Sequence, residues 1–194
     1  YKEKAVYGSC ASAVHVIDLA SGTYLHDIAI HDGGGQIAHG VAVFGRFAYA
    51  GVRDGRAVCA DLEAGAFKWM TTVSELEVFC TPAVNEAWVI VTSYDGRVHG
   101  MHRETGEIKW EHDLGGTPSS PVLLGDNIAV TSDGVFYLLR TENGERLQEL
   151  RIADDITSPA VMKEMILLGT EDGMITVLGG VAENLSSQKD NGNQ

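Results

Sequence analysis

Hydrophobic and polar positions alternate in short runs that are separated by glycine-rich turns. The clearest unit covers residues 88–125. Residues 88–93 (Trp-Val-Ile-Val-Thr-Ser) form an apolar, β-branched run that is typical of a buried strand. Residues 97–102 and 107–112 alternate in character and predict two further strands, and residues 117–124 end in an apolar run that predicts a fourth. Four antiparallel strands in about 40 residues indicate one blade of a β-propeller.

The turns between these runs recur with a fixed period. One turn of each unit contains an Asp-Gly pair, which is the strongest short signal for a β-hairpin. A second glycine follows ten residues later in three of the units, where it can adopt a positive φ. The pairs are Asp54-Gly55, Asp95-Gly96, Asp133-Gly134 and Asp172-Gly173, and the second glycines are Gly65, Gly106 and Gly144, with Gly22 in the same frame. A period near 40 residues indicates a repeat architecture.

The predicted fold class is therefore an all-β propeller of four-stranded antiparallel blades, with about five blades. A helical solenoid is excluded because the segments are short, rich in Val, Ile and Thr, and broken by glycine. Residues 5–9 align with the second strand of a blade, and residues 174–178 with a third strand. We expect a single propeller domain over residues 1–180 and a polar C-terminal tail over 181–194. Either the chain is an arc of a larger propeller, which we slightly favour, or it closes into a small ring.

Two segments carry a resemblance to a known family. Residues 61–69 (Asp-Leu-Glu-Ala-Gly-Ala-Phe-Lys-Trp) and 103–110 (Arg-Glu-Thr-Gly-Glu-Ile-Lys-Trp) resemble the tryptophan-docking motif of quinoprotein-like propellers, which are built from PQQ-like repeats. The resemblance covers residues 5–180. It implies that Trp69 and Trp110 pack flat between adjacent blades and bury a large apolar area there. Two copies of the motif depart from the pattern, since His26 and Gln148 stand in the tryptophan position.

The same resemblance raises the question of a cofactor. Large dehydrogenases of this family bind pyrroloquinoline quinone (PQQ) and calcium at the propeller axis, next to a vicinal cysteine pair. Cys10, Cys59 and Cys80 are far apart in this sequence, and no Glu–Asn–Asp set can be mapped onto a calcium site. We therefore expect neither PQQ nor calcium, and place the chain in the non-catalytic branch, which includes an assembly lipoprotein of the bacterial outer membrane. The cysteines are expected to be small buried hydrophobes.

Composition narrows the set of partners. The 194 residues include 27 acidic and 14 basic side chains, which gives a formal net charge of −13. Such a surface repels phosphate backbones, so nucleic acids and anionic membranes are disfavoured as partners. No apolar run reaches the roughly 18 residues that a membrane span needs. The sequence leaves the location open between cytoplasm and periplasm.

One irregular loop and several polar pairs are the candidates for chemistry. Residues 31–39 contain three glycines that can cradle an anion, and His31 and His39 are weak candidates for metal ligands. A long connection between blades is the favoured interpretation of this loop. His99 and His112 are expected to face each other across a hairpin that turns at Gly106, as exposed cross-strand residues.

Paired carboxylates at Asp154-Asp155 and Glu171-Asp172 are interpreted as solvated turns. No nucleophile motif is present, so no catalytic residue is assigned. The predicted function is a non-catalytic scaffold that binds a protein partner, with self-association through open blade edges as a further expectation. The alternative is a fragment or accessory domain of a larger enzyme, either a quinone-dependent dehydrogenase or an adenylate-forming enzyme.

Overall fold

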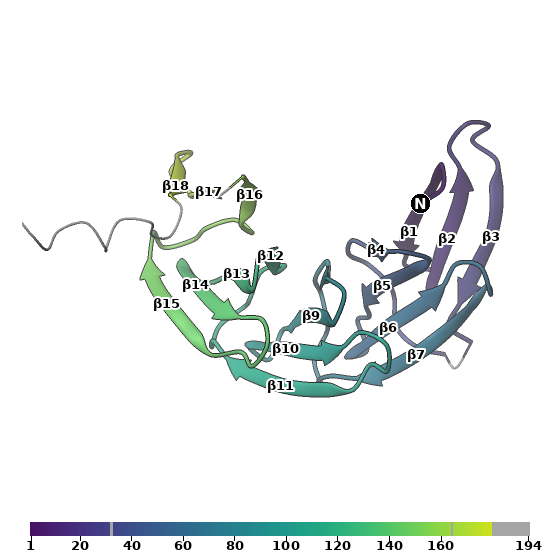
Figure 1. Cartoon of the computed structure of the whole chain (residues 1–194), viewed down its shortest axis with the longest axis horizontal. Coiled ribbons are helices and arrows are strands. Elements are labelled where there is room, and N and C mark those ends of the chain that lie inside the picture. Colours follow the sequence, from purple (N-terminus) through teal and green to yellow (C-terminus); the bar gives the residue numbers. More distant parts are fainter. Residues whose placement is uncertain (32, 164, 180–194) are drawn as a thin grey trace, which may run out of the picture.

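The computed structural model describes residues 1–31, 33–163 and 165–179, and these residues form five antiparallel β-sheets. The described residues contain strands and turns and no helix. Figure 1 shows that the sheets follow one another along an open arc in chain order, with the first and last sheets apart at its two ends. The structure therefore has the arc and not the small closed ring. The expected tail over residues 181–194 lies outside the described residues.

Each sheet is one blade, and its strands are neighbours in chain order. The first blade has three strands: β1 (Lys4–Ser9), β2 (Ala13–Asp18) and β3 (Tyr24–Ala29). The second blade has four: β4 (Ala42–Phe44), β5 (Phe47–Gly51), β6 (Arg56–Asp61) and β7 (Ala66–Thr72). The third blade also has four: β8 (Ala83–Val84), β9 (Trp88–Ser93), β10 (Arg97–His102) and β11 (Ile108–Asp113).

The remaining two blades continue the pattern. The fourth blade contains β12 (Val122–Leu124), β13 (Asn127–Ser132), β14 (Val135–Arg140) and β15 (Arg146–Arg151). The fifth contains β16 (Ala160–Met162), β17 (Met165–Gly169) and β18 (Ile175–Leu178). The all-β class, the antiparallel blades and their number are confirmed, and the first and last described blades have three strands as the alignment of the repeats predicted.

A register shift recurs at the same place in the first four blades. It lies in the pairing between the outermost strand and the strand next to it, close to the turn that joins these two strands. The outermost strand carries the additional residue. Such a β-bulge re-aims the side chains beside it. The pairs just before the shift are Val16 with His26, Cys59 with Trp69, Gly100 with Trp110, and Leu138 with Gln148. His26 and Gln148 therefore occupy the same structural position as the two tryptophans.

The hydrophobic core consists of four clusters, and each cluster joins two neighbouring blades. In the second cluster, for example, Tyr49 and Cys59 of the second blade contact Val91 and Met101 of the third. The same sharing holds between the first and second, third and fourth, and fourth and fifth blades. The inner blades thus bury both faces, which explains why strands such as β9 are continuous apolar runs.

The two end blades bury only one face. Val177 on β18 is 50% exposed, although the equivalent residues of the second and fourth blades, Cys59 and Leu138, are 0% and 4% exposed. Tyr7 on β1 is likewise 44% exposed. The arc therefore ends in two partly apolar sheet faces.

Candidate functional site

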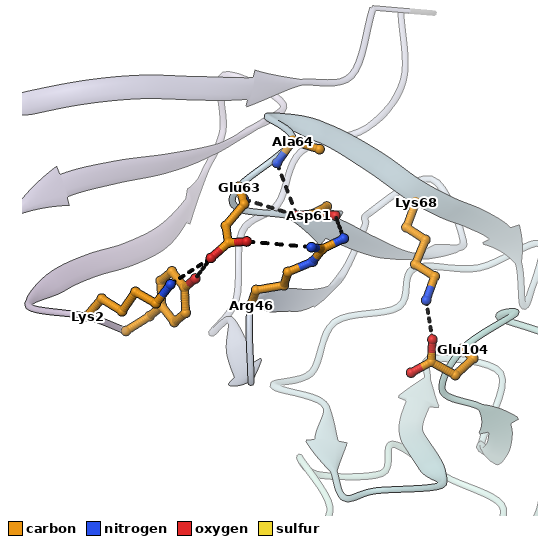
Figure 2. A network of polar contacts seen from close by, with 8 residues as sticks. Lys2, Arg46, Asp61, Glu63, Ala64, Lys68 and Glu104 are labelled. Carbon is orange, nitrogen blue, oxygen red and sulfur yellow. Dashed lines mark hydrogen bonds and ion pairs between the residues drawn. The ribbon is translucent and has the colours of Figure 1, made fainter.

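The structure places Trp69 at the junction between the second and third blades. Its ring lies against Gly106, where an added Cβ would be 2.6 Å from the ring atom Cδ2 of Trp69. The indole Nε1 donates a hydrogen bond to the backbone oxygen of Arg103 at 3.0 Å. Lys68, beside Trp69, forms an ion pair with Glu104 of the next blade (Figure 2). The indole thus covers the next blade's turn and satisfies one of its carbonyl groups.

Trp110 repeats this arrangement at the next junction. A Cβ on Gly144 would lie 2.4 Å from Cε3 of Trp110, and Nε1 donates to the backbone oxygen of Thr141 at 3.0 Å. Gly144 has φ of +69°, and Gly106 has φ of +72°. Glycine is therefore required at both positions for two reasons. The turn needs the left-handed conformation, and the indole ring occupies the space that a side chain would take.

The Asp-Gly pairs make a second set of contacts between blades. Asp54 of the second blade accepts a hydrogen bond from the amide of Gly35 at 2.7 Å, and Gly35 lies in the connection from the first blade. Asp133 accepts from the amide of Thr117 at 3.3 Å, and Asp95 from the hydroxyl of Ser74 at 3.0 Å. The pair was interpreted as a hairpin turn alone. In the structure its carboxylate also holds the chain that enters from the preceding blade.

Asp172 departs from this pattern. Its carboxylate accepts from the hydroxyl of Thr170 within its own turn. The neighbouring Glu171 replaces it at the junction and accepts from the amides of Asp154 at 3.2 Å and Asp155 at 3.1 Å. The two acidic pairs noted in the sequence are therefore exposed parts of one junction, and Glu171 links them.

The pKa values of the junction carboxyls reflect these hydrogen bonds. Burial raises the pKa of Asp95, but the hydroxyls of Ser93 and Ser74 lower it by more, and the net shift is downward. At Asp54, burial again raises the pKa, and hydrogen bonds from Arg56 and the Gly35 amide outweigh it. Both groups are consequently held as carboxylates, the form that accepts the hydrogen bonds of the junction.

The two histidines of the irregular loop make separate contacts. His31 is exposed and lines a cleft at the outer edge of the first two blades. His39 has Nδ1 3.1 Å from the hydroxyl of Thr81, and its ring meets that of Phe79 edge-on with centroids 4.8 Å apart. Within the described residues, no group of three or more His, Cys, Asp or Glu side chains is arranged to hold a metal ion. The loop acts here as a connection between blades.

The expectation that His99 and His112 face each other is wrong. His99 pairs with Glu111, and His112 pairs with Val98. The reason is that Gly106 ends the turn and does not lie at its centre, as the hydrogen bond from the His102 amide to the Glu107 oxygen shows.

His99 is also buried, at 1% exposed, and not a surface residue. Its Nε2 lies 3.0 Å from the hydroxyl of Ser93, whereas Nδ1 has no hydrogen-bond partner and is 3.9 Å from a carboxylate oxygen of Glu111. Burial lowers the pKa of His99, which favours the neutral imidazole.

The cysteines follow the expectation only in part. Cys59 and Cys80 are buried free thiols, and burial raises the pKa of each to about 11. Cys10 is exposed, because it lies in the turn between β1 and β2. The two buried thiols are therefore unreactive packing residues.

A polar network joins the N-terminal segment to the second blade (Figure 2). Glu63 accepts from the Lys2 ammonium at 2.7 Å and from the Tyr1 hydroxyl at 2.8 Å. Arg46 lies 2.8 Å from a carboxylate oxygen of Asp61 and 3.5 Å from one of Glu63. The hydrogen bond from Lys2, and then that from Tyr1, lowers the pKa of Glu63 to about 2. Because Lys2, Arg46 and Glu63 are exposed, their contacts orient the segment more than they stabilise the fold.

The junction between the first two blades lacks a docked tryptophan. His26 occupies the position, and its Nε2 is buried without a hydrogen-bond partner. Gly65 keeps a φ of +67°, but no atom lies within 4 Å of the position that its Cβ would take. A cleft of about 660 Å³ opens there between β3 and β7. This junction therefore has the same glycine turn as the next two junctions, but no tryptophan ring covers it.

Five antiparallel blades, joined by indole docking and by Asp-Gly turns, define the chain as a β-propeller of PQQ-like repeats. A family model described as outer membrane protein assembly factor BamB matches residues 11–178. The chain belongs to this family. A search of curated protein sequences gave no match. None of the described residues forms a helix long and apolar enough to cross a membrane.

Solved structures share the fold at low sequence identity. The crystal structure of BamB from Moraxella catarrhalis has 24% identity and a TM-score of 0.77, over 90% of this chain and 54% of that one. A chain of the Mitotic Checkpoint Complex crystal structure has 15% identity and a TM-score of 0.79, over 90% and 58%. The computationally designed Ika8 protein has 16% identity and a TM-score of 0.66, over 92% and 69%. The chain thus spans about half the length of the BamB that it matches.

The two glycine positions provide a matched test of indole docking. Gly106→Ala introduces a methyl group against Trp69, whereas Gly65→Ala introduces one into open space, and both positions have nearly the same φ. The left-handed strain is therefore common to both variants, and only Gly106→Ala adds overpacking. We expect Gly106→Ala to lower the free energy of unfolding by about 2 kcal/mol more than Gly65→Ala, measured by urea denaturation. Equal losses would show that the ring contact contributes nothing.

The depressed pKa of Asp95 predicts acid sensitivity. A carboxyl whose pKa is lower in the folded state than its ordinary value of 3.8 stabilises the fold above that value, and the contribution is lost as the pH falls through the folded pKa. We expect the free energy of unfolding to decrease as the pH falls below about 5. In the Asp95→Asn variant this decrease should be less steep. Denaturation series at several pH values measure both slopes. Asp126→Asn, which makes the same charge change at an exposed turn, is the control, and identical slopes for Asp95→Asn and the unmodified chain would refute the assignment.

Proposed function

We propose that the chain is a non-catalytic propeller module that binds a protein partner during the assembly of outer-membrane proteins. The observation that carries this proposal is its membership of the BamB family over residues 11–178. The location that follows is the periplasm, where proteins destined for the outer membrane are assembled.

The structural roles of the polar motifs support the proposal of a scaffold that has no catalytic activity. Two tryptophans, three of the Asp-Gly carboxylates (Asp54, Asp95 and Asp133) and Glu171 are engaged in holding blades together. His39 is engaged by Thr81 and Phe79, and the burial of His99 lowers its pKa. These residues are therefore structural, and the exposed turns and sheet edges remain as the surface that meets a partner.

The acidic surface indicates the class of partner. A net charge of −13 disfavours nucleic acid and anionic lipid, and leaves a polypeptide as the partner. We propose that neither PQQ nor calcium is bound, since the described residues bring together no set of three His, Cys, Asp or Glu side chains suited to a metal.

A gene deletion in the source organism tests the assembly role. We expect the deletion to reduce the folded fraction of outer-membrane β-barrel proteins, measured by their heat-dependent mobility on gels, and the gene to restore that fraction when supplied on a plasmid. An unchanged folded fraction would refute the role. The enzyme alternative is tested separately by adding PQQ and calcium to the purified protein. We expect neither a rise in melting temperature nor reduction of a redox dye.

Self-association through the end blades stays a prediction. The exposure of Val177 and Tyr7 on the two end faces favours it, because equivalent positions in the inner blades are covered by a neighbouring blade. We expect sedimentation velocity to show a dimer or a longer species that Val177→Asp disrupts. A monomer at every concentration would exclude it. Val43→Asp changes an exposed valine of β4 and serves as the control.

A further inference from the structure

Three consecutive junctions offer the same turn to a ring from the preceding blade, and only two of them are filled. Trp69 covers Gly106, and Trp110 covers Gly144. The first junction has Gly65 in the same conformation, with φ of +67°, but nothing lies within 4 Å of its Cβ position. The difference arises from His26, which is smaller than the indole that this position carries in the second and third blades.

The register shows that His26 truly replaces a tryptophan. It pairs with Val16 immediately before the bulge, as Trp69 pairs with Cys59 and as Trp110 pairs with Gly100. Its Nε2 is buried and lacks a hydrogen-bond partner, which is costly for a polar atom. In the filled junctions, by contrast, the indole N–H donates to the carbonyl three residues before the glycine. The first junction therefore leaves both a vacant volume and an unsatisfied polar atom.

The walls of the vacancy suit an aromatic ring. The cleft measures about 660 Å³, within the range of small-ligand sites. Its lining includes Leu25, Phe67 and Gly65. Tyr24 is 54% exposed and Leu25 is 41% exposed, so the site is open to solvent from the outer edge of the arc. A flat apolar ring with one polar N–H would cover this surface, and its N–H would donate to the carbonyl of Leu62, which matches the acceptors in the filled junctions.

We propose that the cleft between β3 and β7 binds a tryptophan side chain supplied by a partner polypeptide. The indole takes the place that Trp69 and Trp110 take in the next two junctions, with its ring over Gly65 and its N–H toward the carbonyl of Leu62. The proposal rests on the proposed interaction role, since a partner supplies the ring. Its test needs no partner, so failure of the site to bind indole would leave the interaction role standing.

The first experiment uses the full chain labelled with ¹⁵N. Indole and then N-acetyl-tryptophanamide are titrated to millimolar concentration, and the amide resonances are followed by NMR. We expect saturable shifts of Gly65, Phe67 and His26. No binding at millimolar concentration, or shifts centred on another part of the arc, would overturn the proposal.

The second experiment fills the site from within the chain. His26→Trp places the missing ring, and the double variant Val16→Cys, His26→Trp reproduces the Cys59–Trp69 pair if Val16 crowds the single variant. We expect the filled variant to bind indole at least about tenfold more weakly and to melt at a higher temperature. Gln148→Trp adds a tryptophan at the matching position of the fourth blade and should leave indole binding unchanged. Equal binding by the filled and unmodified chains would refute the assignment.

Discussion

The structure depends on the burial of apolar sheet faces between neighbouring blades. A three- or four-stranded sheet cannot remove its own apolar face from water, and each hydrophobic cluster of this chain is shared by two sheets. Stacking is therefore what makes every blade stable. The alternation of strands and turns sets the shape of a blade, but the apolar residues on both of its faces make an array necessary.

Polar contacts fix how the stacked sheets are oriented. Apolar contact is nondirectional, so it permits sliding and rotation between two sheets. The indole hydrogen bonds at Arg103 and Thr141 fix the outer part of two junctions, and carboxylates such as Asp54 fix the turn that faces the incoming connection. At the two junctions that have both kinds of contact, the two attachment points fix one relative orientation of the neighbouring sheets. These contacts specify the arc more than they supply its stability.

The sequence predicts the fold well because the signals for strands and turns are local. Asp-Gly pairs, second glycines and apolar runs recur with a period, and the repeats agree with one another. The partners of Asp54 and Glu171 could not be predicted, since they depend on which connection crosses a turn in three dimensions. The pairing of His99 failed because the centre of the hairpin lies one residue and a half before Gly106, between Glu104 and Thr105. The empty position at Gly65 follows from the departure at His26, but only the register in the structure shows that the two residues share one junction.

The sharing of each core cluster by two adjacent sheets also governs how the molecule comes apart. Each blade contacts its neighbours and little else, so the free energy of the array is close to a sum over its junctions, as in a one-dimensional chain of coupled units. The end blades have one junction each, and neither of these junctions has a docked indole, because His26 and Gln148 stand in the tryptophan position. Thermal fluctuations therefore open the array from its ends, where the first and the fifth blade detach at a lower free-energy cost than the inner blades. A ligand bound at Gly65 would hold the first blade against the second. Binding at the outer edge would therefore make the arc more rigid.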